Sequence, residues 1–349
     1  MTYEIDQFPG RVLSIEGKTY RYFGGTAYLG LQTDPAFQDL FITNIKKYGT
    51  NYGASRNSNV RLTVFERAEA QLAKIVGSAA CTTLSSGYLA GQFVAKQFNQ
   101  PHYSCFYAPN THSALVTQDE RCFDNYDDLN TVVRNSLTEN PAITPVVFLD
   151  SIDFSGRNYP DFDGVKLLPL SKIIIIIDDS HGIGIVGHHG GGIFQSVSQL
   201  KPKELVVCAS LGKGFGIQAG ALFGSKPRMQ QFSETNFFGG ASPAAPAAMG
   251  TFLQAEGIYQ DKRQLLAEKT DLFLSELNDS SRFSFMKGHP VFSFSDISLT
   301  NYLGDKQVVV TNFPYPSEGA TVMSRIVISA AHTSGDISAL AKLINSYRS

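Results

Sequence analysis

The sequence predicts an α/β protein with a largely parallel sheet covered by helices on both faces, together with a smaller α+β domain. Strand-like runs alternate with helix-compatible stretches over residues 60–224, which is typical of βαβ units. One run, residues 173–177, consists of isoleucine alone, as expected of a strand buried on both faces. At 349 residues the chain also exceeds the usual size of one domain, so a second domain is expected.

The first segment, residues 1–48, is predicted to be an arm that contains a short hairpin. Its residues RVLSIEGKTYRYF place apolar side chains on both sides of a Glu16-Gly17 turn. A helix is expected over residues 60–77, where apolar residues recur at helical spacing and Gly77 provides a C-cap. The strand-like runs that follow are residues 103–108, 143–152, 173–179, 204–211 and 219–224.

The C-terminal part of the chain begins after the proline-punctuated residues SPAAPAAM, 242–249, which lead into a helix-compatible stretch that reaches about Leu277. The remainder is rich in Ser and Phe and predicts a small α+β domain. The changes of pattern divide the chain into an N-terminal arm (1–48), a large domain (49–255) and a small C-terminal domain (256–349).

Composition excludes several functional classes. The net charge is −2, so no basic field indicates nucleic-acid binding. The longest aliphatic run is far shorter than the ~20 residues of a membrane helix, and the first residues lack the pattern of a secretory signal. The four cysteines are widely spaced and no His cluster has metal-ligand spacing, so we expect reduced thiols, a cytoplasmic protein and no metal.

Polar residues follow three of the strand-like runs, where ligands of open α/β sheets bind. The isoleucine strand ends in Asp178, Asp179, Ser180 and His181. Buried carboxylates need partners, and the cationic ring nitrogen of a cofactor is one such partner. A helix N-cap is the alternative role for this motif.

The strand-like run 204–211 is followed by Lys213, which lies among Gly212, Gly214 and Gly216 in the sequence. Glycine permits close approach of another group, and a partly buried amine loses its proton easily and becomes nucleophilic. The spacing does not match a nucleotide P-loop, since Gly214 follows the lysine. The motif therefore favours a lysine that forms a Schiff base, with a structural lysine as the alternative.

The third polar segment is Ser85-Ser86-Gly87, which precedes a helix-compatible stretch. The start of a helix offers free N–H groups to a phosphate, although a simple capped helix fits equally well. Read in order with His112, the carboxylate strand end and Lys213, these segments resemble fold-type I enzymes that use pyridoxal 5′-phosphate (PLP).

The resemblance narrows to the α-oxoamine synthase family, which includes 8-amino-7-oxononanoate synthase and 2-amino-3-ketobutyrate CoA ligase. Five segments in the family's order carry it: YLGL (28–31), KYGTNYGASR (47–56), DDSHGIGIVG (178–187), SLGKGFG (210–216) and SRIVISAAHT (324–333). It implies a large, mostly parallel seven-stranded sheet domain, a small α+β domain, PLP as cofactor and a homodimer with the active site at its interface.

The resemblance also implies roles for individual residues. Lys213 would carry PLP as a Schiff base, Asp178 would pair with the ring nitrogen, and His181 would bond the ring's 3-oxygen. His112 would stack on the ring, while the phosphate and oxygen contacts would come from Ser86, Gly87, Tyr88, Ser210 and Ser151. Arg325, with Thr26 nearby, would bind the carboxylate of the amino-acid substrate. His332 is expected to be structural.

Departures from the family pattern mark a divergent member. Thr26 stands where Asn is usual, and Gly239-Gly240 replaces a Ser-Thr pair whose Thr reaches the phosphate of the neighbouring subunit. Gly91, Gly191 and Asn59 also differ from the common residues. The resemblance implies condensation of an amino acid with an acyl-CoA or another acyl thioester. The alternatives are another PLP reaction, such as transamination, and a PLP-binding protein that has lost activity.

Overall fold

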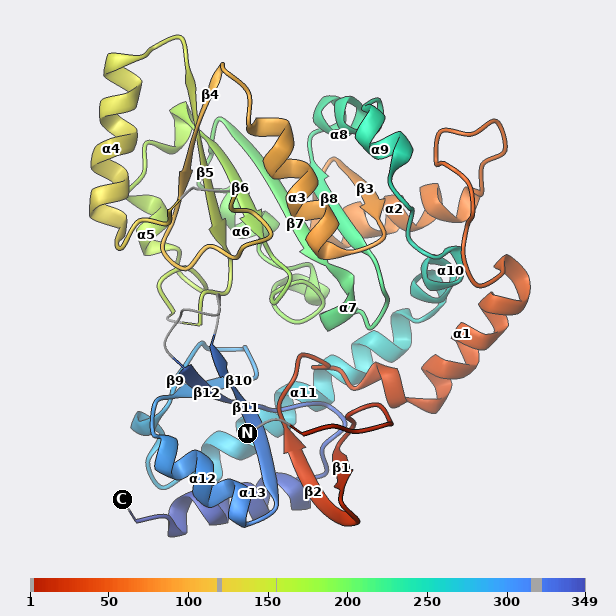
Figure 1. Ribbon diagram of the computed structural model, residues 1–349, viewed down its shortest axis with the longest axis vertical. Helices are drawn as coiled ribbons and strands as arrows, with labels where there is room; N and C mark the ends of the chain where they lie inside the picture. Colours follow the sequence, from red (N-terminus) through yellow and green to blue (C-terminus); the bar gives the residue numbers. More distant parts are fainter. Residues whose placement is uncertain (1–2, 118–120, 155, 315–321, 349) are drawn as a thin grey trace. The chain divides into compact units, whose positions relative to one another are not determined.

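The computed structural model describes residues 3–117, 121–154, 156–314 and 322–348 (Figure 1). The chain forms two compact units. One comprises Asp39–Asp153 and Arg157–Glu256, and the other Met1–Gln38, Phe154–Gly156 and Gly257–Ser349. The predicted division at residues 48 and 255 remains a proposal for the domains of this chain.

The larger unit is built on a sheet with the strand order β3-β8-β7-β6-β5-β4. The strands are β3 (Ala80–Leu84), β4 (Tyr103–Tyr107), β5 (Thr144–Asp150), β6 (Ile174–Asp178), β7 (Glu204–Ser210) and β8 (Gly220–Gly224). β4 to β7 run parallel, and β8 is antiparallel to both of its neighbours. The mostly parallel α/β class is confirmed.

The predicted number of seven strands is wrong for the described part of the chain, where this sheet has six. The sequence predicts a strand end before Ser85 but gives no bounds for that strand, which is β3. Its residues ACTTL lack the β-branched aliphatic run that marks β6, although Cys81 to Leu84 are all buried. Pairing with β8 supplies its hydrogen bonds, so tertiary context makes this segment a strand.

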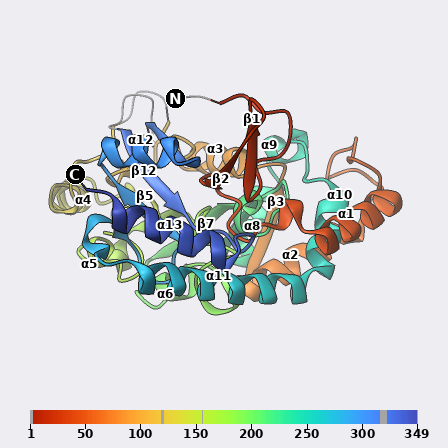
Figure 2. The same cartoon turned by 90° about the horizontal axis from the view of Figure 1, so that it is seen from below.

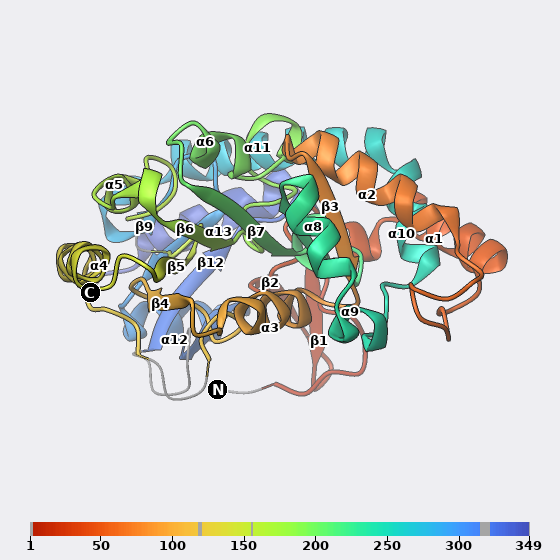
Figure 3. The ribbon, with the colours of Figure 1, turned by 90° about the horizontal axis from the view of Figure 1, so that it is seen from above.

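Both faces of the sheet are buried, as the isoleucine run predicts. Ile174 and Ile176 belong to a core with α3 (Gly87–Phe98) and α8 (Lys226–Ser233), whereas Ile175 and Ile177 point to the opposite face. Figure 3 shows α3 on one side of the sheet and α6 (Phe194–Ser198) on the other. Other helices of this unit are α2 (Thr63–Val76), α4 (Tyr126–Glu139), α5 (Asp163–Lys166), α7 (Leu211–Gly214), α9 (Asn236–Gly240) and α10 (Pro246–Gln254).

One predicted helix end is confirmed, and one predicted helical stretch is wrong. Gly77 ends α2 in the left-handed conformation at φ +77°, which only glycine adopts without strain. The single helical stretch expected up to Leu277 is two helices, α10 and α11 (Glu256–Glu276). They are separated at Ala255, whose N–H donates to Phe252 O, three residues back.

The smaller unit contains a second sheet, in the order β1-β2-β11-β12-β10-β9. Its strands are β1 (Val12–Ile15), β2 (Lys18–Phe23), β9 (Ser284–Phe285), β10 (Val291–Phe294), β11 (Val308–Pro314) and β12 (Val322–Val327). The predicted hairpin is present, and Glu16 and Gly17 both have positive φ as a two-residue hairpin turn requires. β2 then pairs with β11, so the arm completes this sheet.

Helices of the smaller unit are α12 (Ile297–Asp305) and α13 (Ser334–Ser346), besides α11 and the first turn of α1 (Pro35–Tyr48). α11 and α13 lie side by side (Figure 2), and the Ser338 hydroxyl donates to Glu276 at their contact. Over the described residues, no helix is both long and apolar enough to cross a membrane.

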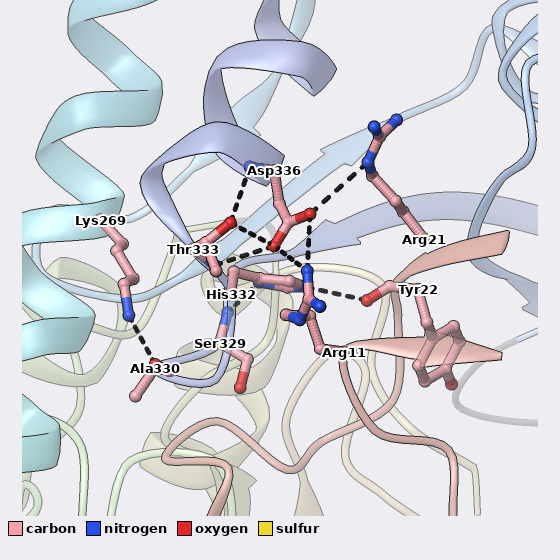
Figure 4. Close-up of polar contacts among 9 residues, drawn as sticks. All are labelled: Arg11, Arg21, Tyr22, Lys269, Ser329, Ala330, His332, Thr333 and Asp336. Atoms are coloured by element: carbon pink, nitrogen blue, oxygen red, sulfur yellow. Dashed lines mark hydrogen bonds and ion pairs between the residues drawn. The ribbon is translucent and has the colours of Figure 1, made fainter. Parts of the chain in front are cut away.

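A polar cluster ties the arm to the start of α13 (Figure 4). Asp336 accepts hydrogen bonds from Arg11 at 2.9 Å and from the backbone N–H of Thr333 at 2.9 Å. His332 lies beside them, and its Nδ1 accepts the Ser329 N–H while its Nε2 lies 2.9 Å from the Tyr22 carbonyl. These contacts make His332 a neutral ring protonated at Nε2, in keeping with the expected structural role.

This cluster makes stability depend on pH. Burial lowers the pKa of His332 below 6.5, so the unfolded chain binds this proton more readily than the folded one. We therefore expect His332 to contribute a fall in the free energy of unfolding as pH drops below about 6.5, and His332→Gln to remove this contribution to the slope. Urea titrations between about pH 5 and about pH 8 measure it, and an identical slope in both proteins contradicts the assignment. Asp336 acts at lower pH. Burial alone would raise its pKa, but the hydrogen bonds from Thr333 and Arg11 outweigh burial and lower the pKa below 3.8.

Candidate active site

Lys213 lies in α7, directly after β7, where Ser210 caps the short helix. Its Nζ is 2.9 Å from Nε2 of His181, and the side chain is partly buried. The backbone around the lysine is held by glycines. A Cβ on Gly184 would lie 2.7 Å from the Gly214 carbonyl carbon, so the two chain segments touch backbone to backbone. The position of Lys213 therefore depends on the loop that follows β6.

Because of this contact, Gly184→Ala is expected to be strongly destabilising. Gly184 has φ +83°, and an added methyl group would also overlap Gly214. Together these effects should lower the free energy of unfolding by about 3 kcal/mol. Gly240→Ala is the matched control, since nothing lies within 4 Å of its Cβ position. Urea unfolding of both variants tests the contact, and equal effects would contradict it.

The carboxylate strand end predicted at β6 is buried. Asp178 is 8% exposed, and its Oδ1 accepts the Ser180 N–H at 2.8 Å. The Ser180 hydroxyl in turn accepts the Ser210 N–H at 2.8 Å, which joins the ends of β6 and β7. No helix begins at Asp178 in the structure, which instead places turns after it. The carboxylate shapes a turn that carries His181 toward Lys213.

His112 follows β4 and lies near the charges of Asp178 and Lys213. Its backbone N–H donates to Asp150 Oδ1 at 3.0 Å. Its ring Nδ1 accepts the Ala114 N–H at 3.1 Å, so the neutral ring carries its proton on Nε2. Burial lowers the pKa of His112; the charge of Asp178 opposes this and that of Lys213 adds to it. His112 is thus a neutral, oriented ring near neutral pH.

Asp150 was not among the predicted site residues. It ends β5 directly opposite Asp178 in the register, is 5% exposed, and holds the backbone of His112. Burial, followed by the charge of Asp178, raises its pKa well above 3.8. The rule that located Asp178, a carboxylate at the end of an apolar strand, also applies to residues 143–150 and would have found it.

The start of α3 meets the end of β7. Ser86 is the N-cap, and its Oγ accepts the Leu89 N–H at 3.1 Å. A Cβ on Gly87 would lie 2.8 Å from Ser210 N and closer still to the Ser210 side chain. The structure thus brings Ser86, Gly87 and Ser210 together, whereas the side chain of Tyr88 is exposed. The first N–H groups of a helix have no intrahelical acceptor, so they are available to an anion.

Ser151 has a different neighbour from the one that the resemblance implies. Its Oγ donates to Asp179 Oδ1 at 2.6 Å, and both side chains are buried. A direct contact with a cofactor therefore stays a prediction for Ser151.

Two of the departures from the family pattern have a steric explanation. A Cβ on Gly91 would lie 2.9 Å from Ala114 O, so α3 packs closely on the segment that carries His112. A Cβ on Gly191 would overlap the carbonyl of Ile75 in α2. Larger residues at these positions would require the neighbouring backbone to move.

The two substrate-side candidates belong to the smaller unit. Arg325 on β12 is 6% exposed, and its guanidinium lies 4.8 Å from the centre of the Phe154 ring and 5.5 Å from that of Phe313. Thr26 is partly buried after β2. Stacking holds the guanidinium plane, which suits bidentate recognition of a carboxylate. Over the described residues, no group of His, Cys, Asp and Glu side chains could hold a metal ion.

Comparisons with known proteins identify the family. The model for aminotransferase class I and II matches residues 156–344. The 8-amino-7-oxononanoate synthase of Aliivibrio fischeri is 25% identical over 98% of this chain and 92% of its own length. The fold is similar to that of Sphingomonas wittichii serine palmitoyltransferase, with a TM-score of 0.81, 16% identity, and coverage of 98% of this chain and 91% of that one. A structure of SPT with its PLP internal aldimine gives a TM-score of 0.82, 17% identity, and coverage of 99% and 92%.

The likeness to the solved structures confirms the fold that the resemblance implied, and the family match covers more than half of the sequence. With these findings, the chain belongs to the aminotransferase class I and II family, as a PLP-dependent transferase of the α-oxoamine synthase type.

Proposed function

We propose that this enzyme condenses an amino acid with an acyl-CoA, or another acyl thioester, to give an α-oxoamine, with PLP held on Lys213. The observation that carries the proposal is the convergence of Lys213, His181, Asp178 and His112 after the carboxyl ends of β7, β6 and β4. The names of similar proteins, 8-amino-7-oxononanoate synthase and serine palmitoyltransferase, support the reaction class.

The residues present fit PLP. A primary amine is available at Lys213, a buried carboxylate at Asp178 suits a protonated ring nitrogen, and His112 offers a neutral ring for stacking. The phosphate would lie at the α3 N-terminus, with Ser210 and the N–H groups of Gly87 and Tyr88. Close packing of Gly87 on Ser210 leaves no space there for a side chain, which suits a cradle built from backbone groups.

When bound, PLP supplies an electron sink that stabilises negative charge at the α-carbon of the amino acid. Lys213 would hold PLP through its amine and would also act as the base that takes the α-proton of the substrate. His181, 2.9 Å from Nζ, orients that amine. Nε2–H of His112 would donate to the thioester carbonyl or the substrate carboxylate, and Arg325, with Thr26, would bind the carboxylate. We further propose a cytoplasmic homodimer with the active site at its interface.

Release of CoA tests the reaction class directly. The purified enzyme is incubated with single amino acids, with and without an acyl-CoA, and free thiol is measured. We expect thiol release that requires both substrates. Amino-group transfer that is independent of thioester would contradict the proposal in favour of transamination. Bound PLP whose absorbance no amino acid changes would indicate a protein that has lost activity.

A further inference from the structure

Asp179 is a buried carboxyl group for which the proposed mechanism has no use. It directly follows Asp178, and successive residues at the end of a strand point to opposite faces. Its side chain therefore lies on the far side of the sheet from that of Asp178. It is 1% exposed, its Oδ1 accepts from the Ser151 hydroxyl at 2.6 Å, and its Oδ2 accepts from the Ile193 N–H at 3.1 Å.

The loop between Gly182 and Ile193 encloses this carboxyl group. A Cβ on Gly182 or on Gly192 would lie 3.1 Å from the carboxyl carbon of Asp179 and closer still to one of its oxygens. Gly192 also has φ +72°. Glycine is therefore required at both positions, because a side chain there would overlap the Asp179 carboxylate. Through Ser151, the same carboxylate reaches the residue that follows β5.

This loop determines where two of the proposed catalytic residues lie. His181 precedes it by one residue, and the Asp179 carbonyl accepts from the N–H groups of Gly182 and Ile183. Further along, Gly184 packs against Gly214, next to Lys213. A shift of the loop would move His181 relative to Lys213 and would remove the support behind α7.

We propose that Asp179 is a positioning residue whose carboxylate ties the 182–193 loop to the end of β5 and so holds His181 against Lys213. The inference rests on the proposed function, because it takes these two residues as the cofactor's partners.

The charge of Asp179 is unfavourable for stability, so the positioning role rests on the hydrogen bonds of this side chain and not on its charge. Burial raises its pKa to about 7; Ser151 and Ile193 oppose this effect and Asp178 adds to it. The pKa values of Tyr159 and Cys208 are also raised, by burial first and by nearby acidic groups, Asp179 among them. A neutral residue of the same shape would avoid this penalty.

Three variants separate positioning from general stability. Asp179→Ala removes both hydrogen bonds, and Ser151→Ala removes one. Asp179→Asn keeps the shape, since its amide oxygen accepts from Ile193 while its NH₂ donates to the Ser151 oxygen. Two measurements are made on folded protein: hydrogen exchange of residues 181–193 without PLP, and the Kd of PLP from its absorbance. The first measurement does not depend on cofactor binding.

For Asp179→Ala we expect faster exchange in the 181–193 segment and a Kd for PLP about tenfold higher. Ser151→Ala should raise it about threefold, and Asp179→Asn should stay within about twofold of the wild type. Unchanged exchange and Kd in a folded Asp179→Ala variant would overturn the inference. If that variant does not fold, hydrogen exchange of residues 181–193 in Ser151→Ala without PLP decides: unchanged exchange overturns the inference. The Kd of that variant is not used, because Ser151 is also a predicted cofactor contact. If the wild type itself does not bind PLP, the proposed function fails, while the exchange data still show whether Asp179 holds the loop.

Discussion

Lys213→Ala is expected to abolish the absorbance of the Schiff base between PLP and the protein and to lower the rate of CoA release by about 10³-fold. The amine is the group that bonds the cofactor and, in the proposed reaction, takes the α-proton. Absorbance spectra of the purified protein and thiol release with saturating substrates measure the two effects. PLP added to the variant should still bind at the α3 N-terminus, since the phosphate contacts are unchanged.

Lys226→Ala is the matched control. Lys226 also follows a strand of the same sheet, after β8, but its side chain is exposed at the start of α8. We expect its absorbance and rate to equal those of the wild type. An unaltered PLP spectrum in Lys213→Ala would refute the assignment of this lysine.

Asp178→Asn is expected to lower the rate by about 10²–10³-fold while leaving PLP bound. The amide oxygen can still accept the Ser180 N–H, so the turn after β6 should keep its form. A neutral amide cannot hold the ring nitrogen in its protonated state, and the electron sink is weakened as a result. The rate with saturating substrates measures the loss of catalysis, and the Kd of PLP shows whether the cofactor still binds.

Asp163→Asn serves as the control for this prediction, because the Asp163 carboxylate is exposed and pairs with Lys166 in the same helix. Its rate should be unchanged. A rate for Asp178→Asn equal to that of the control would show that the carboxylate is not the partner of the ring nitrogen.

Much of the architecture is encoded locally. The isoleucine run, the Glu16-Gly17 turn and the Gly77 cap each depend on properties of a few neighbouring residues, and the structure has the predicted element at each place. β3 and the break at Ala255 do not have such signals. β3 is a strand because it pairs with β8, which lies far away in the chain.

Local patterns in the sequence predicted the fold class, the family resemblance and the strand ends after which Lys213, Asp178 and His112 lie. The contacts of Asp150 opposite Asp178, and of Ser151 with Asp179, became visible in the folded chain. Which side chains meet is set by the register of strands that are distant in the chain and by close glycine contacts. The local sequence pattern contains neither of these. The structure likewise decided that the loop behind His181 is held by a carboxylate from the opposite face of the sheet.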